Sequence, residues 1–258
     1  MIEALLWDVD GTLAETERDG HLVAFNYAFQ ALNVPWRWNE QRYGALLKVS
    51  GGRERLLYDM RFQEHAPAEM GEREQLAERV HRVKNQLYAD IVARDQLKLR
   101  EGVRDLMEDC VLAKVRMGIV TTTSRCNVDS LMAGQIGENW TALFATVVCA
   151  EQAPQKKPHP QAYLLALQNL QVEPYLAVAI EDAAAGMSAA QAAGIPVVIT
   201  HSHYFPSVSS EAALAVGASL GRSQGWKPSA DTRVSRISLE QINHWWAAFV
   251  CTQARDLG

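Results

Sequence analysis

The fold of this chain is decided by the stretch Leu5-Leu6-Trp7-Asp8-Val9-Asp10-Gly11-Thr12-Leu13, near the N-terminus. An apolar run leads into two acids separated by one residue, then glycine and threonine, which is typical of a buried strand that ends in a polar loop. Because strand side chains alternate between faces, we expect Asp8 and Asp10 to point the same way. A solvated acidic turn is the alternative, but acids this close to an apolar strand should be paired or metal-bound. The stretch therefore predicts a cation site.

Composition indicates an ordinary globular protein. The chain has 258 residues, 48% of them hydrophobic, and a net charge of -5, so it can bury a large core in one domain or two unequal ones. Its basic residues are scattered, which excludes the footprint of a nucleic-acid-binding protein. The four cysteines show no Cys-x-x-Cys spacing, and we interpret them as free thiols of a reducing compartment. We find no signal peptide and no membrane span, and expect a soluble cytoplasmic protein.

The segment that follows the first strand has a helical pattern. Apolar residues at Leu22, Phe25, Phe29 and Leu32 form one stripe of an amphipathic helix. Similar stripes continue to about residue 95, and no strand signal interrupts them. The predicted helices cover residues 19–32, 40–47, 54–62 and 72–92.

Beyond residue 95, short β-branched runs alternate with amphipathic helices. This alternation predicts a parallel sheet with helices on both faces, and the first strand, 4–9, must join it. The predicted strands are 117–120, 146–149, 177–180 and 196–199, and the predicted helices are 102–113, 128–136, 161–170, 186–193 and 239–249. Residues 217–236 show weak periodicity and are interpreted as loop.

The pattern therefore predicts an α/β fold, a Rossmann-like doubly wound parallel sheet with an inserted α-helical cap domain. We assign residues 1–15 and 96–258 to the catalytic core and residues 16–95 to the cap. The cap should lie over the carboxyl ends of the strands, where open α/β sheets bind ligands.

Polar residues follow each predicted core strand. They are Asp8 and Asp10, the run Thr121-Thr122-Thr123-Ser124, the pair Lys156-Lys157, and the pair Glu181-Asp182. Carboxylate oxygens hold Mg²⁺, while a lysine, a hydroxyl and backbone N–H groups stabilise the oxygens of a transferring phosphoryl group. An ionised aspartate can attack phosphorus without a base. These residues predict a phosphoryl-transfer site with a Mg²⁺ cofactor.

Four segments carry a family resemblance, in the order Asp8-x-Asp10-x-Thr12, a threonine in the second loop, Lys157-Pro158-x-Pro160, and Glu181-Asp182 followed by Gly186 and residues 189–194. Together they resemble the signature motifs of the haloacid dehalogenase superfamily, over residues 1 to about 200. The resemblance implies that Asp8 is the nucleophile, that Asp10 is the general acid and base, and that Lys157 neutralises charge. Thr122 is preferred to Thr121 as the phosphate-binding hydroxyl by counting back from Ser124.

The resemblance also implies a metal site. Asp8, the carbonyl of Asp10 and Asp182 would ligate Mg²⁺, and Glu181 would hold a metal-bound water. Asp10 argues against the dehalogenase branch, which lacks this second acid. His201 and His203 could suggest a second metal, but without a third ligand a surface loop is the better interpretation.

The helical cap resembles the branch that contains β-phosphoglucomutase, phosphoglycolate phosphatase and the CbbY-type sugar-bisphosphate phosphatases, and details of residues 10–17 and 51–55 are closest to the last group. The substrate-binding residues expected on this basis are Glu17, Tyr43, Gly52, Arg53, Arg55, Lys84, Thr123 and Ser124. Each cap residue has a structural alternative: a helix-start acid for Glu17, a core ring for Tyr43, and solvated faces for the basic residues.

The leading hypothesis is a Mg²⁺-dependent phosphatase that hydrolyses a small sugar phosphate, specifically a pentulose bisphosphate such as xylulose 1,5-bisphosphate, through an aspartyl-phosphate on Asp8. The alternatives within the superfamily are a β-phosphoglucomutase or another sugar-phosphate or phosphoglycolate phosphatase. A phosphate-binding regulatory module without turnover is the alternative from a different class, and the complete set of acids and lysine argues against it. We expect a monomer whose partner is a small phosphorylated sugar.

Overall fold

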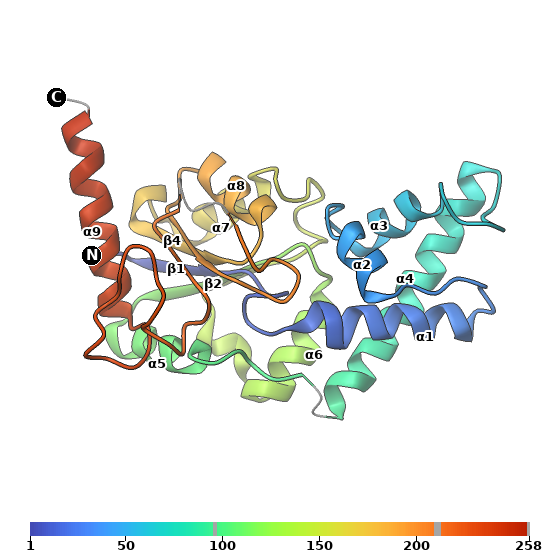
Figure 1. Cartoon of the computed structure of the whole chain (residues 1–258), viewed down its shortest axis with the longest axis horizontal. Coiled ribbons are helices and arrows are strands. Elements are labelled where there is room, and N and C mark those ends of the chain that lie inside the picture. Colours follow the sequence, from blue (N-terminus) through green and yellow to red (C-terminus); the bar gives the residue numbers. More distant parts are fainter. Residues whose placement is uncertain (95–96, 209–212, 257–258) are drawn as a thin grey trace.

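A parallel sheet forms the centre of the molecule in the computed structural model, which describes residues 1–94, 97–208 and 213–256 (Figure 1). Within these residues the sheet has six strands in the order β3-β2-β1-β4-β5-β6. The strands are β1 (Ala4–Trp7), β2 (Arg116–Val120), β3 (Thr146–Val148), β4 (Ala177–Glu181), β5 (Val197–Thr200) and β6 (Ala215–Gly217). Trp7 at the end of β1 pairs with Ile119 of β2 and Ile180 of β4, so β1 lies between the strands that carry the other candidate site residues.

Helices cover both faces of the sheet (Figure 1). The buried core on one face includes residues of α5 (Val103–Ala113), α6 (Arg125–Ile136) and α9 (Leu239–Asp256), and the core on the other includes residues of α7 (Gln161–Leu170) and α8 (Ala184–Ala192). Two 3₁₀ turns, Trp140–Leu143 and Pro174–Leu176, precede β3 and β4. The predicted doubly wound α/β fold is confirmed.

Strand β6 was missed by the sequence analysis. It has three residues, one of them Gly217, and it pairs in parallel with β5. Three residues are too few to show an alternating pattern, and glycine lowers β-propensity further. Trp226 packs where a Cβ on Gly217 would stand, which explains why this position has no side chain.

A separate group of helices lies between β1 and β2 in the sequence and beside the sheet in space (Figure 1). It consists of a π-helical turn η1 (Glu17–Leu22), α1 (Val23–Ala31), α2 (Glu40–Leu46), α3 (Gly52–Asp59) and α4 (Met70–Ala93). This group, which we call the helical cap, buries an aromatic-rich core of its own around Phe25, Phe29, Trp38 and Tyr43. Its core is distinct from the two cores on the faces of the sheet.

The two chain connections to the cap run together. Ala14 forms an antiparallel bridge with Leu99, and the N–H of Arg100 donates to the carbonyl of Leu13 at 2.8 Å. The domain boundaries at 15/16 and 95/96 stay predictions, and residues 95 and 96 lie outside the described residues. Among the described residues, no helix combines the length and apolarity that crossing a bilayer requires. The cytoplasmic location and the monomeric state stay predictions.

Candidate active site

Three carboxylates meet at the carboxyl edge of the sheet. Asp8 follows β1, and its N–H donates to the carbonyl of Ile180 at 3.1 Å, which holds it beside the end of β4. Glu181 ends β4 and Asp182 follows it. One oxygen from each of the three carboxylates lies within 4.8 Å of the other two, and all three residues are buried. The structure thus brings together three of the four acids that the sequence placed at the strand ends.

Lys157 is the cation among these acids. Its Nζ donates to Oδ1 of Asp8 at 2.7 Å and to Oε1 of Glu181 at 2.6 Å, and also to the carbonyl of Val120 at 2.7 Å. The hydroxyl of Tyr163 donates to the same Glu181 oxygen at 2.6 Å. Glu181 therefore anchors the lysine, which in turn reaches Asp8.

The charge balance of this cluster favours a divalent cation. Three buried carboxylates face one ammonium group, so negative charge is in excess. Burial raises the pKa of Asp8, against the opposing effect of Lys157, and burial also raises the pKa of Asp182. Charged groups in a dry site need compensation, and a hard cation with oxygen ligands supplies it. The residues present fit a bound Mg²⁺.

Two glycines permit the close packing around the acids. Gly11 has a φ of +83°, and a Cβ there would lie 2.1 Å from Oδ2 of Asp182. A Cβ on Gly186, in the first turn of α8, would lie 2.0 Å from the Glu181 carboxylate. The backbone at both positions must approach a carboxylate more closely than any side chain allows.

The loop after β5 supplies a further partner. Oγ of Ser202 donates to Oδ2 of Asp182 at 2.6 Å. Sequence reasoning missed Ser202, because nothing in its neighbourhood shows that the β5 loop folds over the β4 loop. His203, its neighbour, lies 3.6 Å from a Glu40 oxygen, and the described residues show no metal cluster that includes His201 or His203.

Asp10 is not one of the three clustered acids, and its carboxylate contacts residues at the start of the cap. Its Oδ1 accepts hydrogen bonds from the hydroxyl of Thr16 and interacts with Nε2 of His21 at 2.9 Å. Burial alone would raise the pKa of Asp10, but His21 and Thr16 outweigh it and lower the pKa to about 2. His21 is buried in η1 and stacks on Tyr88, with ring centroids 4.4 Å apart. Sequence reasoning missed His21, which the pattern placed only within a helix.

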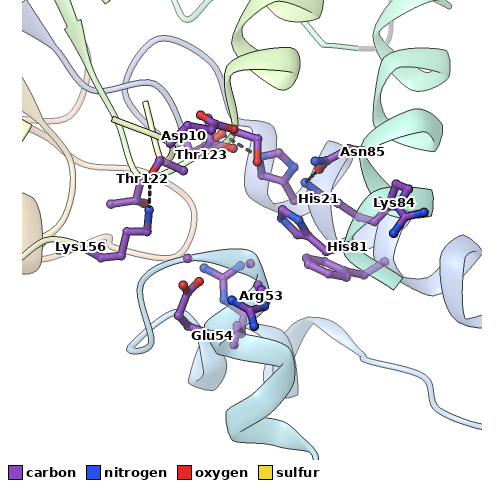
Figure 2. Close-up of a pocket in the computed structure, with 18 of the residues that line it drawn as sticks. Asp10, His21, Arg53, Glu54, His81, Lys84, Asn85, Thr122, Thr123 and Lys156 are labelled. Atoms are coloured by element: carbon purple, nitrogen blue, oxygen red, sulfur yellow. Dashed lines mark hydrogen bonds and ion pairs between the residues drawn. The ribbon is translucent and has the colours of Figure 1, made fainter. Parts of the chain in front are cut away.

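A cavity of about 500 Å³ separates the sheet edge from the cap. Figure 2 shows Asp10, Thr122 and Thr123 on one side of it, and Arg53, His81 and Lys84 on the other. The predicted site residues that line the cavity are Asp10, Glu17, Gly52, Arg53, Arg55, Lys84, Thr122, Thr123 and Ser124. The cap and the core therefore build one cavity together.

The structure distinguishes the two threonines that the sequence left open. Thr122 lines the cavity, whereas Thr121 is buried and its Oγ1 accepts a hydrogen bond from the N–H of Thr123 at 3.2 Å. The structure therefore places Thr122, and not Thr121, at the cavity.

A buried network connects three of the predicted cap residues. Tyr43 is fully buried, and its hydroxyl donates to Oε2 of Glu17. Arg55 donates from Nη1 to the same hydroxyl at 2.8 Å, and its guanidinium lies over the Tyr43 ring. Tyr43 therefore lies behind the cavity wall, where it supports Glu17. The sequence analysis expected both residues to bind the substrate.

Two further basic groups line the cap side of the cavity. Lys84 is 3% exposed, its Nζ donates to Oδ1 of Asn85 at 3.3 Å, and burial lowers its pKa to about 8. His81, which sequence reasoning missed, has its pKa lowered to about 3 by burial and by Lys84. His81 is therefore neutral near pH 7, and Lys84 carries the charge.

The parallel sheet, the strand-end acids and the buried lysine define a class of protein. They are typical of Rossmann-like hydrolases, whose active-site acids lie at the carboxyl ends of a parallel sheet. The chain belongs to the haloacid dehalogenase-like hydrolase family, whose family profile matches residues 2–194. The enzyme class expected from the sequence, a phosphatase of this family, is confirmed.

Several relatives cover most of the chain. Protein CbbY of Cupriavidus necator is 39% identical over 85% of this chain and 86% of its own length. The crystal structure of CbbY from Rhodobacter sphaeroides with phosphate superposes with a TM-score of 0.79 at 36% identity, over 85% of this chain and 95% of that one. An aspartate-to-asparagine mutant of the same protein, similar to the same degree, was solved with xylulose 1,5-bisphosphate. The β-phosphoglucomutase of Clostridium difficile, at 21% identity and a TM-score of 0.73, shares the fold.

Proposed function

We propose that this protein is a Mg²⁺-dependent phosphatase that hydrolyses a pentulose bisphosphate such as xylulose 1,5-bisphosphate through a phosphorylated Asp8. The observation that carries the proposal is the cavity between the sheet edge and the cap, which has hydroxyls of the second loop on one side and basic residues on the other. Similarity to a protein solved with xylulose 1,5-bisphosphate supports this substrate.

Asp8 acts as the nucleophile in this proposal. Lys157 holds Oδ1 of Asp8, so the carboxylate is fixed and its second oxygen, Oδ2, attacks phosphorus. The bond between phosphorus and the sugar oxygen breaks, and the phosphoryl group passes to Asp8. The ammonium of Lys157 and the hydroxyl of Thr122 stabilise negative charge on the phosphoryl oxygens.

Asp10 moves the protons. With a pKa of about 2 it is ionised near neutral pH, which suits the second half of the reaction, in which it takes a proton from the water that attacks phosphorus. The bond between phosphorus and Oδ2 of Asp8 then breaks, and inorganic phosphate leaves. In the first half it must donate a proton to the leaving sugar oxygen. The negative charge of a bound bisphosphate raises the pKa of Asp10 and favours its protonated form. His21 and Thr16 orient the carboxylate in both halves.

Asp8, Asp182 and the carbonyl of Asp10 would ligate Mg²⁺, and Glu181 would hold one of its waters. When bound, Mg²⁺ neutralises charge on the phosphate and orients it toward Asp8. Glu181 already accepts hydrogen bonds from Lys157 and Tyr163, which supports an indirect role rather than direct ligation.

The cap recognises the rest of the substrate. Lys84, Arg53 and Arg55 line the cavity opposite the second loop, where they can bind a second phosphate. Glu17 lines the same cavity and can accept hydrogen bonds from sugar hydroxyls. Thr123, Ser124 and the backbone at Gly52 complete the binding surface.

The test is phosphate release from xylulose 1,5-bisphosphate by the purified protein with Mg²⁺, compared with Asp8→Asn and with a chelator. We expect rapid release by the wild type, and none above background from Asp8→Asn or after chelation. Release by Asp8→Asn at the wild-type rate would contradict the proposal. Glucose 1-phosphate and phosphoglycolate serve as competing substrates, and an isomerised sugar phosphate as product would instead identify a mutase.

A further inference from the structure

Arg100 has contacts that the proposed chemistry does not use. It follows the second connection from the cap to the core, and its side chain is only 12% exposed. The guanidinium donates to the carbonyls of Gly11 and His201, to Oγ1 of Thr200 at 2.9 Å and to the carbonyl of Ala218 at 3.1 Å. One side chain therefore joins the loops that follow β1, β5 and β6.

The order of the strands links these contacts to the position of Asp182. Strand β4, which precedes Asp182, lies between β1 and β5. Gly11 in the β1 loop lies against Oδ2 of Asp182, where a Cβ would come within 2.1 Å. Ser202 in the β5 loop donates to that same oxygen at 2.6 Å. Asp182 is thus held between two loops, and Arg100 binds both of them.

We propose that Arg100 is a positioning residue for the metal site, which sets the place of the Asp182 carboxylate by fixing the Gly11 and Ser202 loops on either side of it. Arg100 touches no reacting group. It acts through the carbonyl of Gly11, next to Asp10, and through the carbonyl of His201, next to Ser202. This inference rests on the proposed Mg²⁺ site.

The fork of the guanidinium is essential to this role. Four acceptors on three loops require several N–H groups in a fixed plane, which arginine supplies and the single ammonium of lysine does not. Nε of Arg100 also lies 3.6 Å from Glu15 in the first connection. A lysine at this position could keep the charge interaction with Glu15 and still lose the hydrogen bonds to the three loops. Arg100→Lys therefore separates the hydrogen-bond fork from the charge.

The experiment is a Mn²⁺ titration of substrate-free protein, with free Mn²⁺ followed by electron paramagnetic resonance. Loss of groups that orient metal ligands weakens metal affinity by roughly 10- to 100-fold, and we expect that increase in Kd for Arg100→Lys and Arg100→Met. The Mg²⁺ concentration for half-maximal phosphatase activity should rise in parallel. An arginine that only stabilised the fold would lower the melting temperature and leave Kd unchanged.

Arg236→Met is the matched control. Arg236 also makes several hydrogen bonds, to Asp109 at 2.8 Å and to the carbonyl of Ile237, but it ties the segment before α9 to α5, away from the site. We expect this variant to lose stability and to keep the wild-type Kd for Mn²⁺. If the Arg100 variants do not fold, Thr200→Val, which removes one acceptor at similar volume, should raise Kd severalfold.

The outcomes separate the two proposals. If the wild type binds Mn²⁺ and the Arg100 variants, or Thr200→Val in their place, bind it equally well, the role of Arg100 is overturned while the metal site stands. If the wild type binds no Mn²⁺ and needs no Mg²⁺, the proposed metal site fails, and the inference fails with it.

Discussion

The ammonium of Lys157 lies 2.7 Å from Oδ1 of Asp8, although the two residues are 149 positions apart in the chain. Burial makes this contact strong, because the pair is held away from water beside Glu181. Burial lowers the pKa of Lys157, but Asp8 and Glu181 together raise it above its ordinary value. The lysine therefore stays charged near neutral pH.

Lys157→Met should abolish most of the phosphatase activity. Removing a group that stabilises transition-state charge costs roughly 10²- to 10³-fold in kcat, and the loss here also leaves buried carboxylates unpaired. Lys48→Met is the comparison, since Lys48 is an exposed lysine of the cap that does not line the cavity. Steady-state phosphate release measures both. Equal losses in the two variants would argue against a special role for Lys157.

The KM should depend on the charge of Lys84. Burial lowers its pKa from 10.5 to about 8, so the side chain is charged below pH 8 and neutral above it. Binding of a phosphate in the cavity should weaken as the pH rises through 8, and KM should rise with little change in kcat. Lys84→Arg should remove this rise, because arginine stays charged. Lys48→Arg, an exposed lysine of the cap, should retain it, and an unchanged profile for Lys84→Arg would refute the assignment.

The same pKa shift predicts a stability change with a definite sign. Between pH 8 and 10.5 the unfolded chain holds the Lys84 proton more tightly than the folded one, so stability from this group increases as the pH rises through that range. A Lys84→Met variant should lack this increase in chemical denaturation at pH 8 and pH 10.

Gly186→Ala should be destabilising although alanine favours helices. A Cβ at this position would lie 2.0 Å from the Glu181 carboxylate, so either α8 or Glu181 must move, and the Lys157 contact moves with it. We expect a lower melting temperature and about 10²-fold lower kcat, the effect that a misplacement of about 1 Å can have. The control is Gly71→Ala in α4, where a Cβ meets nothing within 4 Å, and its melting temperature should not fall.

Tyr43→Phe should weaken substrate binding. The hydroxyl connects Arg55 to Glu17, and its removal leaves the Glu17 carboxylate held by the longer contact with Arg55 at 3.7 Å. Loss of such a hydrogen bond costs about 1–3 kcal/mol, and we expect about a tenfold rise in KM with kcat largely kept. Tyr58→Phe, on an exposed ring of α3, should leave both constants unchanged. A fall in kcat alone for Tyr43→Phe would place the tyrosine in the chemical step instead.

Sequence reasoning was most successful where one short segment contains the whole signal. The strands β1, β2 and β4 were predicted from their apolar runs, and the acids after them could be placed together because the carboxyl ends of parallel strands share one edge. The residues it missed depend on tertiary packing. His21 reaches Asp10 only because η1 folds back over the sheet edge, and Arg100 and Ser202 reach the site only through the order of the strands.

Where the site residues lie and what they do are separate questions. The structure brings Asp8, Lys157, Glu181 and Asp182 together, and these roles stay predictions until they are measured. The sequence could not show whether Tyr43 is buried in the cap or lines the cavity, because an aromatic residue has the same sequence pattern in both places. Gly11 and Gly186 were visible in the motifs, but only coordinates show that a carboxylate occupies the space of each missing Cβ.

The aromatic core of the cap, built around Phe25, Phe29 and Trp38, is separate from the two cores that hold the sheet. Substitutions in α3 can therefore reshape the distal half of the cavity without touching the cores of the sheet, whereas α4 also places Tyr88, Ile91 and Val92 in one of those cores. This separation lets selection change which molecule is admitted while the reaction is conserved. It also makes α2 and α3, whose buried apolar residues belong to the cap core, a natural unit for exchange in engineered hybrids, in which a new specificity is fitted to an unchanged catalytic centre.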